Sequence, residues 1–122
     1  PDTAPNAEFS YHHRDDRIKA FTVTHVSGPG CPALLDFPFL PTTVVPTRSP
    51  ATDKASHLST FSHDDEVATP GYYGVQLGNG VGVRLTARTR AGFGQFTYPV
   101  GASAGMLVEA GKSVDDGETK VQ

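Results

Sequence analysis

Apolar and polar residues alternate with a period of two over much of this chain, and this alternation constrains the fold more than any other feature. An amphipathic helix needs apolar residues at i, i+3, i+4 and i+7. No stretch of helical length offers that spacing without a glycine or proline in it, since 13 glycines and 10 prolines stand among the 122 residues. We therefore expect a chain built of β-strands and turns.

The clearest pair of strands flanks the short segment Gly78-Asn79-Gly80. Residues 73–77 and 81–85 alternate on either side of it, and Asn-Gly readily adopts the positive φ angles of a tight hairpin turn. We predict a β-hairpin at this point. Gln76 and Arg84 would face water, and the buried face would consist of Val75, Leu77, Val83 and Leu85.

Further strands are expected on both sides of the hairpin. In the first of them, Phe21 and Val23 would share one face. In the second, Pro38 and Pro41 allow only an edge strand or an extended segment, because proline cannot donate to a ladder. The segments with strand character are 18–26, 37–44, 93–98 and 106–108, and residues 45–60 are expected to form a long surface loop.

Short strands with turn signals about every 8–12 residues are typical of an antiparallel β-sandwich, and a small barrel has the same pattern. The length fits one domain.

The net charge is −3 with no stripe of Lys or Arg, so we expect no nucleic-acid partner. No apolar run is long enough for a membrane span. The single Cys31 excludes an internal disulfide.

Three polar clusters are candidates for chemistry. Residues 11–17 hold adjacent His and Asp, which point to opposite faces of a strand, so a solvated turn is favoured over a metal site. Residues 61–66 lack the alternating oxygen ligands and the glycine of a calcium loop, so a charged loop before Pro70-Gly71 is favoured. Residues 24–31 hold two glycines around Pro29, which favours a tight turn over a nucleophile pair.

A family resemblance arises from these clusters in their order along the chain. The motifs that contribute to it are Pro1-Asp2-Thr3, Ser10-Tyr11-His12-His13, residues 21–31 ending in Gly30-Cys31, Phe39-Leu40-Pro41-Thr42, Phe61-Ser62-His63, Pro70-Gly71-Tyr72-Tyr73, the Arg-containing segment 85–90 and Phe96-Thr97-Tyr98-Pro99. Together they resemble the N-terminal domain of the α-mannosidases of glycoside hydrolase family 92. Pro29 and Pro32, which bracket Gly30-Cys31, depart from the family pattern.

The resemblance implies a fold and an activity. It implies that residues 1–122 are part of an N-terminal β-sandwich, supersandwich-like, of a two-domain enzyme whose catalytic helical toroid is absent from this chain. The parent enzyme would be a calcium-dependent, inverting exo-α-mannosidase of the α-1,2 type, with calcium bound by the absent domain. Its partners would be mannose-containing glycans and that helical domain, and bacterial secretion or a periplasmic or cell-surface location is expected. The isolated chain is expected to be inactive.

The resemblance also places one segment at the substrate. We expect a substrate-binding role, without catalysis, for His25, Ser27, Gly28, Gly30 and Cys31. No catalytic residue and no metal ligand is assigned within the chain. The surface around Phe37, Phe39 and Leu40 is expected to face the missing domain. The alternatives are a stand-alone carbohydrate-binding module, disfavoured by scattered tyrosines and no Trp, and a purely structural sandwich.

Overall fold

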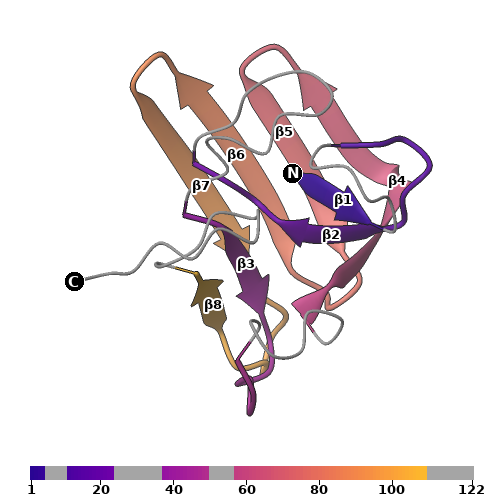
Figure 1. The fold of residues 1–122 in the computed structure, drawn as a ribbon, viewed down its shortest axis with the longest axis vertical. Helices are drawn as coiled ribbons and strands as arrows, with labels where there is room; N and C mark the ends of the chain where they lie inside the picture. Colours follow the sequence, from indigo (N-terminus) through magenta and orange to yellow (C-terminus); the bar gives the residue numbers. More distant parts are fainter. Residues whose placement is uncertain (5–10, 24–36, 50–56, 110–122) are drawn as a thin grey trace.

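The computed structural model describes residues 1–4, 11–23, 37–49 and 57–109, and these residues contain strands and no α-helix. Figure 1 shows how the strands are arranged. All strand pairs are antiparallel. The strands are β1 (Asp2–Ala4), β2 (Arg17–Ala20), β3 (Phe39–Thr42), β4 (Ser59–Thr69), β5 (Tyr72–Leu77), β6 (Gly82–Arg88), β7 (Ala91–Thr97) and β8 (Gly105–Val108).

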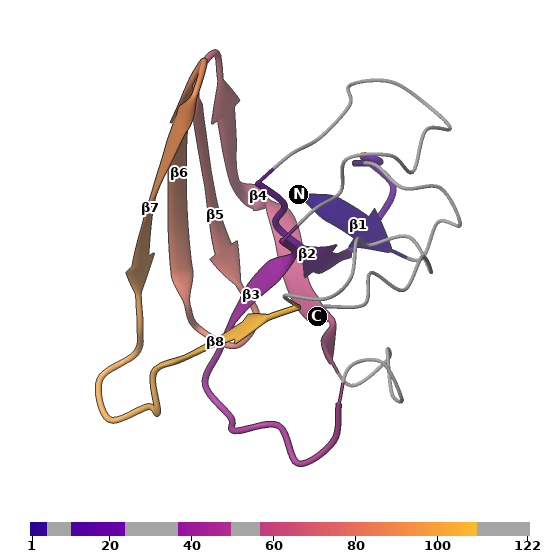
Figure 2. The ribbon, with the colours of Figure 1, turned by 60° about the vertical axis from the view of Figure 1, so that its left-hand side comes forward.

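The strands form two sheets. The larger has six strands in the order β1-β2-β4-β5-β6-β7, and the smaller pairs β3 with β8. Strand β4 takes part in two layers: its beginning pairs with β2, while its end pairs with β5. The register of β4 shifts between Phe61 and Glu66, and such a bulge bends a strand. Figure 2 shows β1, β2 and β3 across from the layer of β5, β6 and β7.

The predicted hairpin is confirmed. Strands β5 and β6 pair through Val75↔Val83, and Gly80 adopts a φ of 84° in the turn. The amide of Gly80 donates to the carbonyl of Leu77 at 2.8 Å, and the amide of Val81 donates to the side chain of Asn79 at 3.1 Å. The Asn-Gly pair therefore forms the tight hairpin turn that the sequence predicts.

The hydrophobic core lies between the two layers. The predicted inner face is confirmed at three positions, where Val75, Leu77 and Val83 are buried, and Leu85 is half-buried against them. The opposite layer contributes side chains from β2, β3 and the segments next to them. The buried members of the core are Ile18, Phe21, Leu40, Phe61, Val75, Leu77, Val81 and Val83. An all-β, two-layered antiparallel architecture is thus confirmed.

Three details differ from the sequence-based expectation. Strand β2 ends at Ala20, and only a single bridge to Phe39 continues it at Phe21, so Val23 is exposed instead of sharing a buried face with Phe21. Residues 61–66 lie within β4 and not in a loop, and the register of the strand shifts within this polar stretch, between Phe61 and Glu66. The last two residues of the surface loop predicted for residues 45–60 lie in a strand, since β4 begins at Ser59.

The expectation for the apolar surface near β3 is also wrong in part. Leu40 is buried in the core and Phe39 packs against it, because β3 covers the inner face of the large sheet. Only Phe37, which precedes β3 with a φ of 51°, is exposed. The predictions of an edge strand there and of strands near 93–98 and 106–108 are confirmed by β3, β7 and β8. Within the described ranges, no helix is long and apolar enough to cross a membrane.

Candidate functional site

The residues predicted to bind substrate fall outside the part of the chain that the structure describes. These residues are His25, Ser27, Gly28, Gly30 and Cys31. The described residues fix the two ends of this connection. Phe21 and Phe39 exchange two backbone hydrogen bonds, each of 2.8 Å, so these two residues on either side of the segment lie next to each other. The assignment of the five residues stays a prediction.

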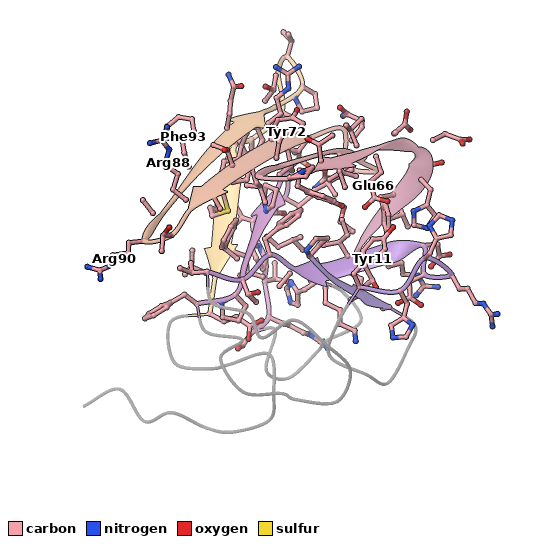
Figure 3. All side chains as sticks on the ribbon, turned by 90° about the horizontal axis from the view of Figure 1, so that it is seen from above. Tyr11, Glu66, Tyr72, Arg88, Arg90 and Phe93 are labelled. Carbon is pink, nitrogen blue, oxygen red and sulfur yellow. The ribbon has the colours of Figure 1, made fainter. Side chains whose placement is uncertain are left out.

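The structure brings together four other polar side chains, which the sequence analysis had placed in two different clusters and in the hairpin. We call Tyr11, His63, Glu66 and Tyr73 the Glu66 cluster. Tyr73 donates to Oε1 of Glu66 at 2.6 Å, and Tyr11 donates to Oε2 at 2.7 Å. Nδ1 of His63 lies 2.8 Å from Oε2. One carboxylate therefore accepts hydrogen bonds from three side chains, and Figure 3 shows Tyr11 beside Glu66.

Local structure explains why these groups meet. Glu66 is opposite Val75 in the ladder, so its side chain points to the inner face of the sheet, as does Tyr73. The bulge in β4 places His63 next to Glu66 on this bend. The loop that contains Tyr11 is attached to β4 by the amide of Phe61, which donates to the carbonyl of Asp16 at 3.0 Å.

The hydrogen-bond partners of His63 define its charge. Nδ1 faces the carboxylate of Glu66, and Nε2 lies 3.1 Å from the carbonyl oxygen of Asp15. Both partners are acceptors, and this favours a hydrogen on both ring nitrogens and thus the imidazolium form. In agreement, the hydrogen bond to Glu66 raises the pKa of His63, although burial opposes this. His63 and Glu66 therefore form an ion pair.

Glu66 stays ionised although only 9% of its side chain is exposed. Burial alone would raise the pKa of this carboxyl, but hydrogen bonds from Tyr73, His63 and Tyr11 hold it below its ordinary value. Burial, together with the negative charge of Glu66, raises the pKa of Tyr11 to about 12 and also raises the pKa of Tyr73. Both phenols thus remain hydrogen-bond donors at neutral pH.

A second hydrogen-bond chain holds the loop that carries Tyr11. The hydroxyl of Thr3 donates to the carboxylate of Asp15 at 2.6 Å and accepts from the amide of His12 at 2.9 Å. Thr3 and Asp15 are both buried. The ring of His13 lies over that of His63, with 4.2 Å between centroids. The residues predicted to be a solvated turn are therefore anchored to the fold.

The Glu66 cluster touches the base of the predicted substrate segment. The ring of Tyr73 lies 6.2 Å from that of Phe21, and Phe21 lies 5.8 Å from Phe39. Phe21 and Phe39 flank the segment in the sequence. The carboxylate of Glu66 fixes the hydroxyl of Tyr73, so it also fixes the aromatic surface against which Phe21 packs.

The polar atoms of the cluster bond to one another, so the arrangement can hold and orient groups. Glu66 cannot serve as a general acid, which needs a proton near neutral pH, because its carboxylate is ionised. Across residues 1–4, 11–23, 37–49 and 57–109, no group of three or more His, Cys, Asp or Glu side chains could hold a metal ion. No local signal in the sequence reveals the cluster, because the bulge in β4 and the contact with Tyr11 appear only in the folded structure.

The two-layered antiparallel fold and the Glu66 cluster on its inner side define a small β-domain. Residues 1–122 match the N-terminal domain of glycosyl hydrolase family 92 over the whole chain. The chain therefore belongs to this family, as its N-terminal domain.

A solved structure with the same fold is that of an inverting mannosidase of family GH92 from Bacteroides thetaiotaomicron VPI-5482. The two share 25% sequence identity with a TM-score of 0.68. The match covers 88% of this chain but only 14% of the mannosidase chain, so this sequence spans a small part of the length of that enzyme. No curated protein matches the sequence.

Proposed function

We propose that this chain is part of the N-terminal β-domain of an inverting exo-α-mannosidase. The observation that supports this most is the family match over residues 1–122, together with the likeness to a mannosidase that is described as inverting. The enzyme releases terminal mannose from glycans, and we propose a preference for α-1,2 linkages. Its location is secreted, periplasmic or on the surface of a bacterial cell.

The role of this domain is to shape one side of the substrate pocket. His25, Ser27, Gly28, Gly30 and Cys31 bind and position mannose, since glycine lets the backbone approach a ligand closely. The contact between Tyr73 and Phe21 supports this role, because it joins the rigid Glu66 cluster to the start of the segment. A rigid support improves the precision of a binding site.

The acid and the base of the reaction lie in the helical domain of the same polypeptide. Inverting hydrolysis uses two carboxyl groups about 6.5–9.5 Å apart, one to protonate the leaving oxygen and one to activate water. Glu66 is ionised, so it cannot protonate the leaving oxygen. Its two oxygens already accept hydrogen bonds from three side chains, so it is also poorly placed to activate water. Calcium is also proposed to bind in the helical domain, where it would help to orient the sugar. The 122-residue chain alone is inactive.

The test is mannose release by the full-length parent enzyme. We expect hydrolysis of α-1,2-linked mannobiose to exceed that of the α-1,3- and α-1,6-linked isomers by at least tenfold in kcat/KM, which is about 1.4 kcal/mol of transition-state binding. Early proton NMR spectra should show β-mannose as the first product. Release of α-mannose first would contradict inversion, and no release from any mannobiose would favour a stand-alone binding or structural module.

A further inference from the structure

The outer face of β5, β6 and β7, which points away from the core, carries a row of exposed aromatic side chains. Tyr72 pairs with Thr86, and Thr86 pairs with Phe93, so these three side chains stand in line across three strands. Strands are spaced by about 4.8 Å, which puts the backbones of Tyr72 and Phe93 about 10 Å apart. Phe93 is 71% exposed and Tyr72 is 39% exposed.

Positive charge is concentrated on the same face. Arg84 and Arg88 lie two residues before and after Thr86 on β6, so all three share one side of the sheet. Figure 3 shows Arg88 close to Phe93, and the ladder places them diagonally across neighbouring strands. Arg90 lies in the turn that follows. Among the described residues none of the three arginines forms an ion pair.

Positive and negative charges are concentrated in different parts of the sequence. Residues 70–108 contain three arginines, no lysine and neither Asp nor Glu, which is a net charge of +3. The whole chain carries 10 basic and 13 acidic residues, so the remainder holds 7 and 13, a net charge of −6. A positive face on an acidic protein attracts anions selectively, because the rest of the surface repels them.

The composition of this face favours a sugar polymer over other anions. Aromatic side chains stack on the apolar face of a sugar ring and remain partly wet. Thr69, Gln76, Gln95 and Thr97 surround the row and provide hydrogen-bonding groups for hydroxyls. The guanidinium of arginine forms two parallel hydrogen bonds with one carboxylate. Three cations without lysine are few for a nucleic-acid site, which relies on many phosphate contacts.

We propose that this outer face, defined by Tyr72, Arg84, Thr86, Arg88 and Phe93, is an accessory binding surface for an anionic glycan chain. Sugar rings lie along the aromatic row, and carboxylate or sulfate groups bind the two arginines of β6. This surface is separate from the Glu66 cluster, in which the side chains of Glu66 and Tyr73 point to the inner face of the sheet. The accessory surface does not depend on the mannosidase activity, and binding and hydrolysis can be measured separately.

The test is binding of the full-length protein to defined polymers by affinity electrophoresis and titration calorimetry. Polygalacturonate and heparin are the anionic probes, and a neutral mannan is the uncharged one. We expect retention by at least one anionic probe, weakened by salt because exposed charges are screened. Phe93→Ala and the double variant Arg84→Ala/Arg88→Ala should each weaken binding about tenfold, or about 1.4 kcal/mol. The matched control Arg48→Ala removes an exposed arginine outside this face and should bind as the wild type does.

Several results would overturn the proposal. One is the absence of binding to both anionic glycans. Another is equal binding by the wild type, Phe93→Ala and the double arginine variant. Polyglutamate or double-stranded DNA bound as tightly as polygalacturonate would show a general polyanion surface, which also overturns it. Circular dichroism and mannose release, measured on the same preparations, confirm that each variant is folded, so loss of the accessory surface can be told apart from failure of the proposed hydrolase function.

Discussion

At the scale of single residues, the carboxylate of Glu66 joins several parts of the fold through its hydrogen bonds. Glu66 is charged in a largely shielded position, where an unpaired charge would cost several kcal/mol. Three donors converge on it, and one of them is the imidazolium of His63. The donors come from β4, β5 and the loop before β2, so the charge joins segments that are 55 residues apart in sequence.

The ion pair predicts a bell-shaped dependence of stability on pH. The pKa of His63 is raised from 6.5, so its contribution is complete below about pH 6.5 and is lost as the pH rises through the folded value. The pKa of Glu66 is lowered from 4.5, so its contribution is complete above about pH 4.5 and is lost as the pH falls through the folded value. Both contributions are complete between these limits.

Thermal unfolding of the wild type and of His63→Gln tests this dependence. The difference between their unfolding midpoints should be largest between about pH 4.5 and pH 6.5 and should shrink at pH 9. Glutamine keeps one donor but cannot become a cation, so it isolates the effect of charge. A difference that is constant from pH 5 to pH 9 would show that folding does not raise the pKa of His63.

At the scale of elements, the hairpin of β5 and β6 depends on Gly80. Its φ of 84° lies in the left-handed region, and a Cβ at this position would meet Cγ of Pro99 at 2.7 Å. Gly101 has a similar φ of 81°, but a Cβ there would meet nothing within 4 Å. Substitution of Gly101 therefore measures the cost of backbone strain alone, while substitution of Gly80 adds the cost of the steric contact with Pro99.

We expect Gly101→Ala to lower the free energy of unfolding by about 1 kcal/mol, which is the cost of a left-handed alanine. Gly80→Ala should lower it by more, because strain and the contact with Pro99 add. Urea unfolding monitored by circular dichroism measures both. Equal losses in the two variants would mean that Pro99 moves aside without cost.

The strands and turns also show which features of the fold can be predicted from the sequence. Alternation and the Asn-Gly turn predicted β5, β6 and the buried Val75, because these are local signals. The end of β2 at Ala20 was missed because the alternation continues after pairing stops. The Glu66 cluster was missed because it needs the bulge in β4 and the contact with Tyr11, which are properties of the tertiary structure.

At the scale of the whole molecule, the curled sheet has two faces with different chemistry. The inner face holds the core, the Glu66 cluster and the packing of Tyr73 on Phe21. The outer face of β5, β6 and β7 holds exposed aromatic and arginine side chains. We propose that this domain acts on substrate from one side, through the segment that starts after Phe21, and supplies no catalytic group.

Kinetics of the full-length enzyme test this claim most directly. His25→Ala and Gly30→Val should each lower kcat/KM on an α-mannoside at least tenfold, about 1.4 kcal/mol, because contacts to the sugar are lost. Their unfolding midpoints should stay close to that of the wild type, and Arg48→Ala should leave both quantities unchanged. Wild-type kcat/KM in well-folded His25→Ala and Gly30→Val enzymes would contradict the account and leave the segment as a connection between β2 and β3.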